Sequence, residues 1–305
     1  MVKFKDSTEF ALFKIMKFLV SFLPRTICLA LGGFVGRFLY HVDKKHRQRA
    51  LANLKNALGD RISSSDLKRT AKSCFKHFGC VFVDILKIRY LSRDTINKLL
   101  IVEGEEHLQE SLLQGKGALL FSAHFGNWEM APAFLSRKGM LNVVARPLDN
   151  RFLEEELKKI RTRLGAKVIY KHQAARPLLR ALKANEMAAI LIDQNVIRSQ
   201  AVFVDFFGKP AATTPSLATF FLKTQAPLIP VFCYPASHRR YHLSIHKPLE
   251  ITLTGKEETD VLKITQLCTK IVQNQIEKIP NYWFWFHNRW KTRPEGEENI
   301  KKETT

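Results

Sequence analysis

The chain has 305 residues, of which 46% are hydrophobic and 25% charged, so its composition is that of a folded globular protein and not of a disordered one. It carries 49 lysines and arginines against 28 acidic residues, a net charge of +21. The five cysteines form no C-x-x-C pair, so we expect neither a disulfide scaffold nor a zinc site. The length suits one large α/β domain with an appendage, or two small domains.

The positive charge is concentrated in the N-terminal third. Residues 1–100 hold 20 basic and 7 acidic residues, whereas residues 101–305 hold 29 and 21. Such an excess implies an anionic partner, and charge alone leaves three classes open: nucleic acid, anionic lipid headgroups or an acidic protein.

Residues 9–42 are the most apolar segment of the chain. Four cations interrupt it: Lys14, Lys17, Arg25 and Arg37. The longest uncharged run, Thr26–Gly36, has 11 residues, whereas a membrane-spanning helix needs about 20. The pattern predicts a pair of amphipathic or shallowly inserted helices, broken near Pro24, whose cations reach the headgroups. We therefore interpret residues 1–45 as a helical membrane anchor; the alternative is a buried helical hairpin of a soluble domain.

Two further regions follow the anchor. Residues 46–100 have helical spacing, with an N-cap cluster at Ser63–Asp66, and are expected to pack on a catalytic domain. Residues 101–305 alternate between strands and helices, which predicts an α/β domain whose mainly parallel sheet is flanked by helices. The expected strands are Gly117–Ala123, Leu141–Arg146, Ala166–Tyr170, Met187–Asp193 and Pro227–Tyr234. The expected helices are Trp128–Lys138, Asn150–Leu164, Ala174–Ala184 and Pro215–Thr224.

Chemistry is expected where these strands end, because ligands of parallel sheets bind beyond the carboxyl ends of the strands. The first expected strand leads into His124, and Glu129 follows five residues later. A carboxylate there can orient one ring nitrogen and leave the other to take a proton. A structural histidine is the alternative, because one such spacing is expected by chance in a chain of this composition. Gly126 permits the tight turn between strand and helix.

Other strand ends carry cations and amides. Arg146 and Asn150 follow one strand, Arg161 and Arg163 lie on the next helix, and Asp193 and Gln194 end a later strand. Arginines around a cleft suit phosphate groups, although charges on a solvated helix face are equally common. No nucleophile motif, zinc motif, P-loop or dinucleotide motif is present. The substrate is therefore expected to supply the attacking group, and neither a cofactor nor a metal is expected.

The C-terminal stretch 281–291 contains three of the four tryptophans beside basic residues. Such a stretch can stack nucleic-acid bases, but no nucleic-acid module frames it. We expect it to pack against the sheet and expect no nucleic-acid partner.

Together these motifs resemble the bacterial lipid A biosynthesis acyltransferases, the late or secondary acyltransferases of lauroyl and myristoyl type in the lysophospholipid acyltransferase superfamily. The resemblance covers essentially the whole chain. It rests on HFGNWE (124–129), ARPLDN (145–150), R-x-x-x-G (161–165), DQN (193–195), FFGKPAATTP (206–215) and WFWFHNRWKTRP (283–294). The glycerolipid branch differs, because no motif like F-P-E-G-T-R follows the strands.

The resemblance implies a glycerolipid-acyltransferase-like fold and a role for each candidate residue. His124 would be the general base that deprotonates a hydroxyl of the acceptor, Glu129 would orient it, and Arg161 would bind phosphate or stabilise oxyanion charge. Arg146 and Asn150 would contact the acceptor. The further substrate-binding candidates are Asn127, Arg163, Asp193 and Gln194.

The implied reaction is transfer of a fatty acyl chain from acyl carrier protein to a hydroxyl of a lipid A precursor, during lipopolysaccharide synthesis. The implied partners are the acidic carrier protein, a phosphorylated glycolipid and an anionic membrane surface. The implied location is the bacterial inner membrane, with the catalytic domain on its cytoplasmic face. The alternatives are acylation of another glycolipid or a lysophospholipid, and a non-catalytic basic protein that binds membranes.

Overall fold

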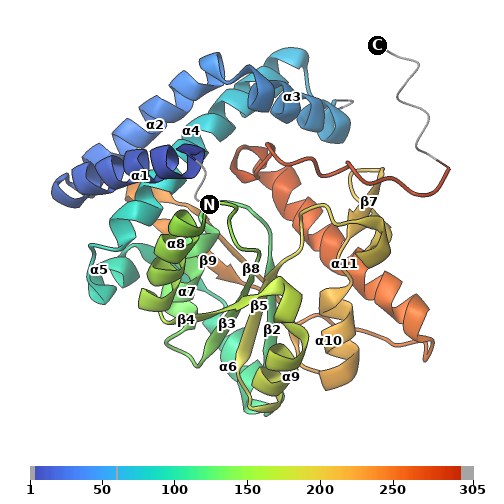
Figure 1. Cartoon of the computed structure of the whole chain (residues 1–305). Coiled ribbons are helices and arrows are strands. Elements are labelled where there is room, and N and C mark those ends of the chain that lie inside the picture. Colours follow the sequence, from blue (N-terminus) through green and yellow to red (C-terminus); the bar gives the residue numbers. More distant parts are fainter. Residues whose placement is uncertain (1–3, 60, 297–305) are drawn as a thin grey trace.

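The computed structural model describes residues 4–59 and 61–296 and has a seven-stranded sheet at its centre (Figure 1). The strand order is β1-β9-β8-β2-β5-β3-β4. The strands are β1 (Leu100–Glu103), β2 (Ala118–Ser122), β3 (Leu141–Ala145), β4 (Ala166–Tyr170), β5 (Met187–Leu191), β8 (Leu228–Pro235) and β9 (Tyr241–Ile245). From β8 to β4 all neighbours are parallel, whereas β9 is antiparallel to β8. The prediction of a mainly parallel sheet is therefore confirmed.

Helices cover both faces of this sheet because the strands are apolar on both sides. In β2, Leu120 belongs to one core cluster, while Leu119 and Phe121 belong to the other. The first cluster is completed by α6 (Glu105–Leu113), α7 (Ala131–Leu135) and α8 (Arg151–Arg163). The second is completed by α9 (Ala175–Lys183), α10 (Ser216–Thr224) and α11 (Glu257–Lys278). Burial on both faces is what a parallel sheet requires.

The N-terminal helices lie across the carboxyl end of the sheet (Figure 1). They are α1 (Phe4–Phe22), α2 (Arg25–Val42), α3 (Lys44–Leu58), α4 (Ser64–Ile88) and α5 (Arg93–Lys98). The predicted break at Pro24 is confirmed, because this residue precedes the first turn of α2. The predicted N-cap is confirmed as well, since the Ser63 hydroxyl accepts a hydrogen bond from the backbone N–H of Asp66 at 3.1 Å.

The described helices, from Phe4 onward, include none with the length and apolar character that a membrane crossing requires. The α1–α2 pair nevertheless has an unusual surface, because it holds twelve of the twenty-one large apolar side chains that are exposed in the described residues. These twelve are Leu12, Ile15, Phe18, Leu19, Phe22, Ile27, Leu31, Phe34, Val35, Phe38, Leu39 and Val42. A patch of this extent on a protein surface marks an interaction site.

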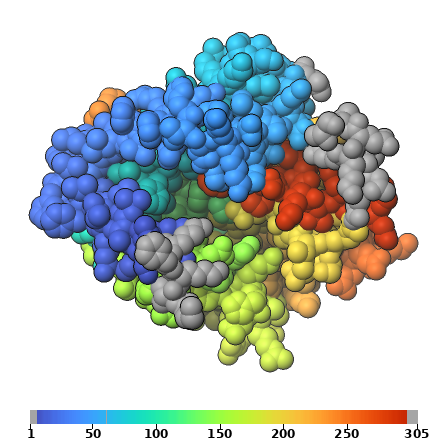
Figure 2. Space-filling model, turned by 45° about the horizontal axis from the view of Figure 1, so that its top comes forward, coloured from blue at the N-terminus to red at the C-terminus, as the bar shows by residue number. Residues whose placement is uncertain are grey.

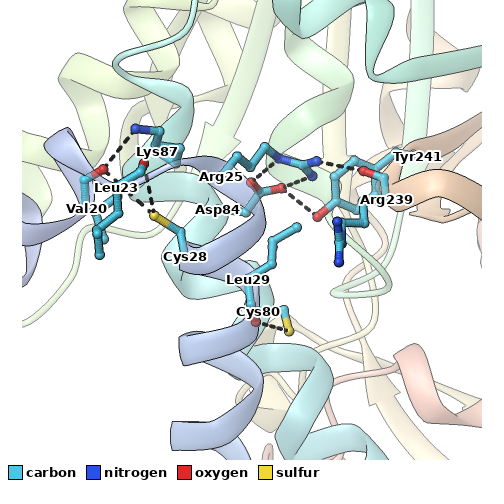
Figure 3. Close-up of polar contacts among 10 residues, drawn as sticks. All are labelled: Val20, Leu23, Arg25, Cys28, Leu29, Cys80, Asp84, Lys87, Arg239 and Tyr241. Carbon is cyan, nitrogen blue, oxygen red and sulfur yellow. Dashed lines mark hydrogen bonds and ion pairs between the residues drawn. The ribbon is translucent and has the colours of Figure 1, made fainter.

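A buried ion pair joins the N-terminal helices to the sheet (Figure 3). Arg25 of α2 donates two hydrogen bonds, of 2.7 and 2.8 Å, to the Asp84 carboxylate of α4, which is fully buried. The hydroxyl of Tyr241, on β9, donates to the same carboxylate at 2.7 Å, and Arg25 also donates to the backbone carbonyl of Arg239. Because a buried charge needs all of these partners, the arrangement fixes the helices over the carboxyl end of the sheet.

The structure departs from the predicted elements in two ways. The expected helix Trp128–Lys138 is a single 3-10 turn, Trp128–Met130, followed by the short α7, which has Pro132 in its first turn and ends at Leu135. Short strands β1, β9, β6 (Val202–Asp205) and β7 (Pro210–Thr213) and the long helix α11 were not predicted. Strands β6 and β7 form a separate antiparallel hairpin.

Candidate active site

His124 lies two residues beyond β2, at the carboxyl end of the sheet. The loop that follows is tight: Gly126 has φ +60°, and a Cβ there would lie 2.0 Å from the carbonyl oxygen of Cys233. Only glycine fits this position, so the turn inferred from the sequence is confirmed. The ring of His77, on α4, donates a hydrogen bond to the Gly126 carbonyl at 3.1 Å, and burial lowers the His77 pKa to about 4.

Asp193 holds His124 from the neighbouring strand. Its Oδ1 lies 2.8 Å from the His124 Nδ1, and its Oδ2 accepts the His124 backbone N–H at 2.9 Å. The indole N–H of Trp283 donates to the same Oδ2 at 2.7 Å. Burial by itself raises the Asp193 pKa, but His124 and these hydrogen bonds outweigh it and lower that pKa below its ordinary value. Asp193 is therefore an ionised acceptor, which places the ring proton on Nδ1 and the lone pair on Nε2.

Gln194 faces the second ring nitrogen. Its side-chain nitrogen lies 3.2 Å from the His124 Nε2. The next residue, Asn195, exchanges two hydrogen bonds with Thr292, of 2.9 and 3.0 Å, and so ties the end of β5 to the C-terminal segment. Within the DQN motif, Asp193 and Gln194 thus contact the two nitrogens of the same imidazole, and Asn195 anchors the segment.

Glu129 has a different partner from the one predicted. Its carboxylate forms a bidentate ion pair with Arg161 of α8, at 3.0 and 2.5 Å, and accepts the indole N–H of Trp128 at 3.1 Å. In the structure Asp193, and not Glu129, contacts the His124 ring, and the catalytic role expected of Glu129 stays a prediction. The physical reason is that the 3-10 turn after His124 directs Glu129 toward α8, while β5 delivers Asp193 beside the histidine.

An apolar cavity lies on the Glu129 side of this loop. It measures about 650 Å³, counted together with the space at its opening, and its walls include Leu120, Leu135, Leu141 and Val231. Ser122, Trp128, Glu129 and Arg161 are among its polar lining residues. A cavity that is mostly apolar with a few polar groups is typical of a small-molecule or acyl-chain site.

Aromatic side chains surround His124 on its other sides. The His124 ring contacts the Trp128 ring edge-on at 4.9 Å between centroids and the Phe284 ring at 6.3 Å, and Phe78 of α4 packs against both of these rings. Figure 2 shows that this end of the molecule is hollowed between the N-terminal helices and the C-terminal segment. The histidine thus lies in a recess walled by aromatic rings and stays accessible, since 21% of its side chain is exposed.

The C-terminal segment forms one wall of the recess. The tryptophans of this segment are buried, with exposed fractions of 1% for Trp283, 0% for Trp285 and 6% for Trp290. The prediction that they pack against the sheet is confirmed, and they are not available to stack bases. Arg289 is buried beside them and lacks a carboxylate partner among the described residues; burial lowers its pKa to about 10. Sequence reasoning missed the Trp283–Asp193 contact, because 90 residues separate the two and no local pattern links them.

The other predicted substrate-binding residues do not meet at His124. Asn150 caps α8 by accepting the Phe152 N–H, and its amide donates to residues of α1. The side chain of Asn127 is fully buried near Tyr241. Arg146 lies at the surface with 82% of its side chain exposed, and Arg163 donates to the Leu91 carbonyl at 3.2 Å.

Comparisons with known proteins agree with this geometry. Residues 5–292 match the family described as "Bacterial lipid A biosynthesis acyltransferase". A lipid A biosynthesis acyltransferase of Haemophilus influenzae is 25% identical, over 92% of this chain and 86% of its own length. The lipid A biosynthesis palmitoleoyltransferase of Escherichia coli is 24% identical, over 91% and 89%. A phosphatidylinositol mannoside acyltransferase of Mycobacterium tuberculosis is 30% identical, over 62% and 60%.

Proposed function

Since the chain belongs to the bacterial lipid A biosynthesis acyltransferase family, we propose that it transfers a fatty acyl chain from acyl carrier protein to a hydroxyl of a phosphorylated lipid A precursor. The observation that carries this proposal is the His124 ring. Its Nδ1 lies 2.8 Å from the Asp193 carboxylate, and its Nε2, on the opposite side of the ring, lies 3.2 Å from the Gln194 side-chain nitrogen.

The proposed step is general-base catalysis without an acyl-enzyme. His124 Nε2 takes the proton of the acceptor hydroxyl, and the hydroxyl oxygen forms a bond with the thioester carbon. Asp193 stabilises the imidazolium that results. The tetrahedral intermediate collapses, the carbon–sulfur bond breaks, and the leaving thiolate takes the proton back from Nε2. All atoms and charges are accounted for by His124, the donor and the acceptor.

The apolar cavity is the proposed site for the transferred acyl chain. Its apolar walls suit a hydrocarbon, and the Glu129–Arg161 pair supplies fixed charge among its lining residues. In this proposal the pair holds the polar end of the donor close to His124, with Trp128 between the two, because the indole contacts both the His124 ring and the Glu129 carboxylate.

An exposed cation at the carboxyl end of the sheet fits the anionic substrates. Arg146 follows β3 there, is highly exposed and has only a loose contact, of 3.7 Å, with the exposed Asp149. We propose that Arg146 attracts acceptor phosphates or the acidic carrier protein. Arg163, at the other end of α8, stays a candidate for the same substrates. Asn150 would act through the contact that it makes between α8 and α1. Asn127, buried near Tyr241, stays a substrate-binding candidate.

The α1–α2 surface is the proposed contact with the bilayer. Its exposed apolar side chains lie among exposed cations, including Lys14, Arg37 and Lys44. This combination suits a helix pair lying in the interface of an anionic membrane. It supports a location at the inner membrane, with the catalytic domain on the cytoplasmic face.

Membrane contact is tested by flotation with vesicles of anionic or zwitterionic lipid. We expect Phe18→Ser and Phe34→Ser together to lower the bound fraction on both vesicle types, since each removes roughly 1.5–3 kcal/mol of apolar burial. Leu262→Ser, on the distant α11, is the matched control and should bind as the wild type does. Equal binding by the double variant would contradict the proposal.

The reaction is tested with detergent-solubilised protein, acyl carrier proteins of several chain lengths and a tetra-acylated, phosphorylated glucosamine disaccharide. Mass spectrometry should show the addition of one acyl chain, absent with His124→Ala and present with His172→Ala, whose histidine is exposed. Acyl coenzyme A as competing donor tests the choice of carrier protein. A folded wild type that transfers no chain from any donor would refute the proposal.

A second acceptor class has its own support. The mycobacterial phosphatidylinositol mannoside acyltransferase is 30% identical over part of the chain, so another glycolipid is the alternative acceptor. The same assay with a mannosylated phosphatidylinositol and with a lysophospholipid, each in competition with the disaccharide, distinguishes these acceptors.

A further inference from the structure

Both ring nitrogens of His124 are occupied in the resting structure. The ionised Asp193 accepts the Nδ1 proton at 2.8 Å, so Nε2 carries a lone pair and accepts. The group 3.2 Å from that lone pair is the side-chain nitrogen of Gln194, which donates. The atom that must take the substrate proton is therefore covered by an amide N–H before the substrate binds.

We propose that Gln194 is a catalytic residue with two positions, resting on Nε2 of His124 and moving to the oxyanion when the acceptor binds. The inference rests on the proposed acyl transfer. The acceptor hydroxyl replaces the amide at Nε2, because a base must hold the proton that it removes. The freed amide N–H then donates to the thioester oxygen, which becomes negative as the new carbon–oxygen bond forms.

The surroundings of Gln194 permit this exchange without movement of the main chain. On one side Asp193 is buried, with 2% of its side chain exposed, and on the other Asn195 is bound twice to Thr292. The backbone is thus fixed at both neighbours. The side chain is half-buried and contacts the ring through its terminal amide. A long side chain on a fixed backbone can change its partner by rotation about its own bonds.

The proton and electrons remain balanced in both positions. In the resting position the amide only shares its N–H with the Nε2 lone pair. In the second position it shares the same N–H with the oxyanion, while His124 carries the acceptor proton. Collapse of the intermediate restores the carbonyl, the thiolate leaves with that proton, and Gln194 returns to Nε2.

The covering of Nε2 is tested without any substrate. Diethyl pyrocarbonate acylates accessible, unprotonated imidazole nitrogens, and peptide mass spectrometry measures the rate at His124. We expect Gln194→Met, which keeps the length and removes the donor, to raise this rate by about fivefold, the factor equal to a net hydrogen bond of ~1 kcal/mol. Gln109→Met, on the exposed face of α6, is the matched control. An unchanged modification rate at His124 in folded Gln194→Met would overturn the proposal that the Gln194 amide covers Nε2 at rest.

The oxyanion position is tested by steady-state kinetics with the donor and acceptor that the wild type uses. Loss of one oxyanion donor is expected to lower kcat by about 10²–10³-fold with little change in KM. Gln194→Glu places a carboxylate at Nε2 that favours the imidazolium, so the acid limb of its pH–rate profile should move to higher pH. If the kcat of Gln194→Met lies within a few-fold of the wild-type value, the proposed contact between the Gln194 amide and the oxyanion is overturned.

The two readouts separate this inference from the proposed function. If the wild type transfers no acyl chain, the proposed function fails, and the modification rate still decides whether Gln194 covers Nε2. Should Gln194→Met not fold, as judged by its melting temperature, Gln194→Glu answers the modification experiment in its place. Its carboxylate beside Nε2 stabilises the protonated ring, which takes its proton from solvent and reacts more slowly with the reagent.

Discussion

Two buried carboxylates lie on either side of the same loop, and each is bound to a basic side chain and one indole. Asp193 is bound to His124 and Trp283, and Glu129 is bound to Arg161 and Trp128. The difference lies in the basic partner. Arginine stays protonated at any physiological pH, whereas histidine gains and loses its proton near neutrality.

Because of this difference, we expect the two pairs to have different roles. The His124–Asp193 pair is able to move a proton, because the imidazole has a second nitrogen, Nε2, that does not contact the carboxylate. The Glu129–Arg161 pair holds a fixed arrangement of charge, because Glu129 outweighs the effect of burial and raises the Arg161 pKa above its ordinary value. Proton transfer is therefore expected to depend on the first pair, and local stability together with the placement of the donor on the second.

The largest expected effect follows from Asp193→Asn. The amide no longer fixes the proton on Nδ1, so the wrong tautomer of His124 prevails and kcat should fall by about 10⁴-fold. The fold should persist, because asparagine fills the same space. Acyl-transfer rates and melting temperature measure the two consequences, and Asp94→Asn on the exposed surface of α5 is the control. Near-normal turnover by a folded Asp193→Asn would mean that His124, oriented by Asp193, is not the general base.

Glu129→Gln is expected to act mainly on stability. It leaves the Arg161 guanidinium buried without its carboxylate, which should lower the free energy of unfolding by about 3–5 kcal/mol. Replacing both partners, as in Glu129→Met with Arg161→Met, should restore part of this loss because no unpaired charge remains. Denaturant unfolding of Glu129→Met, of Arg161→Met and of the double variant measures the coupling between the two side chains.

The same variant also tests the predicted catalytic role of Glu129. If Glu129→Gln loses as much turnover as Asp193→Asn while its melting temperature is unchanged, Glu129 acts on the reacting groups directly. The comparison between the two pairs would then be wrong in its central point.

Much of the fold and part of the site follow from the sequence. The apolar runs predicted five of the seven sheet strands, since parallel strands are buried on both faces and contain uninterrupted apolar residues. His124 was identified because the end of such a strand is where ligands bind. The fold of residues 9–42 into two helices broken at Pro24 was also predicted, from the charges in that segment and the proline.

What the sequence did not predict depends on long-range pairing. A helix beginning at Trp128 would favour a contact between His124 and Glu129, but the chain forms a 3-10 turn and directs Glu129 to Arg161, 32 residues away. Asp193 reaches His124 because β5 pairs with β2, and strand order is set by the whole sheet. Strand β1 was missed because it has only four residues and lies at the edge of the sheet. Strand β9 was missed because polar residues alternate with its apolar ones, so it contains no apolar run.

His77 gives a pH-dependent test of the loop that joins the two pairs. Its folded pKa is about 4, whereas an unfolded histidine has a pKa of about 6.5. Between these values the unfolded chain binds more protons, so the free energy of unfolding falls as the pH falls, by up to about 3 kcal/mol at pH 4. Above pH 6.5 this contribution to stability is fully present. His77→Gln should reduce the slope of stability against pH over this range.

The control for His77 is His172→Gln, which changes an exposed histidine. Its slope should match that of the wild type. Burial also lowers the pKa of His287, to about 4, and that of His246, so both contribute to the slope that remains in His77→Gln. A His77→Gln profile parallel to the wild type would mean that the ring does not stay neutral beneath Gly126.

The smallest expected effects compare the two indoles. Trp283→Phe removes the N–H that reaches Asp193 at 2.7 Å in a buried setting, and Trp128→Phe removes the one that reaches Glu129 at 3.1 Å beside a half-buried ring. Both substitutions delete the same atoms, so the difference between them reports the hydrogen bonds. We expect losses of about 1.5–3 kcal/mol in unfolding free energy for Trp283→Phe and about 0.5–1.5 kcal/mol for Trp128→Phe.

The acyl-transfer rates of these two tryptophan variants extend the same comparison. Trp283→Phe weakens the hold on Asp193 and should lower kcat, because the orientation of His124 depends on that carboxylate. Trp128→Phe leaves Glu129 with both of its bonds to Arg161, so kcat should change less. The opposite order of kcat losses would mean that the Glu129 side of the loop, where the Trp128 ring also contacts the His124 ring, controls the chemistry.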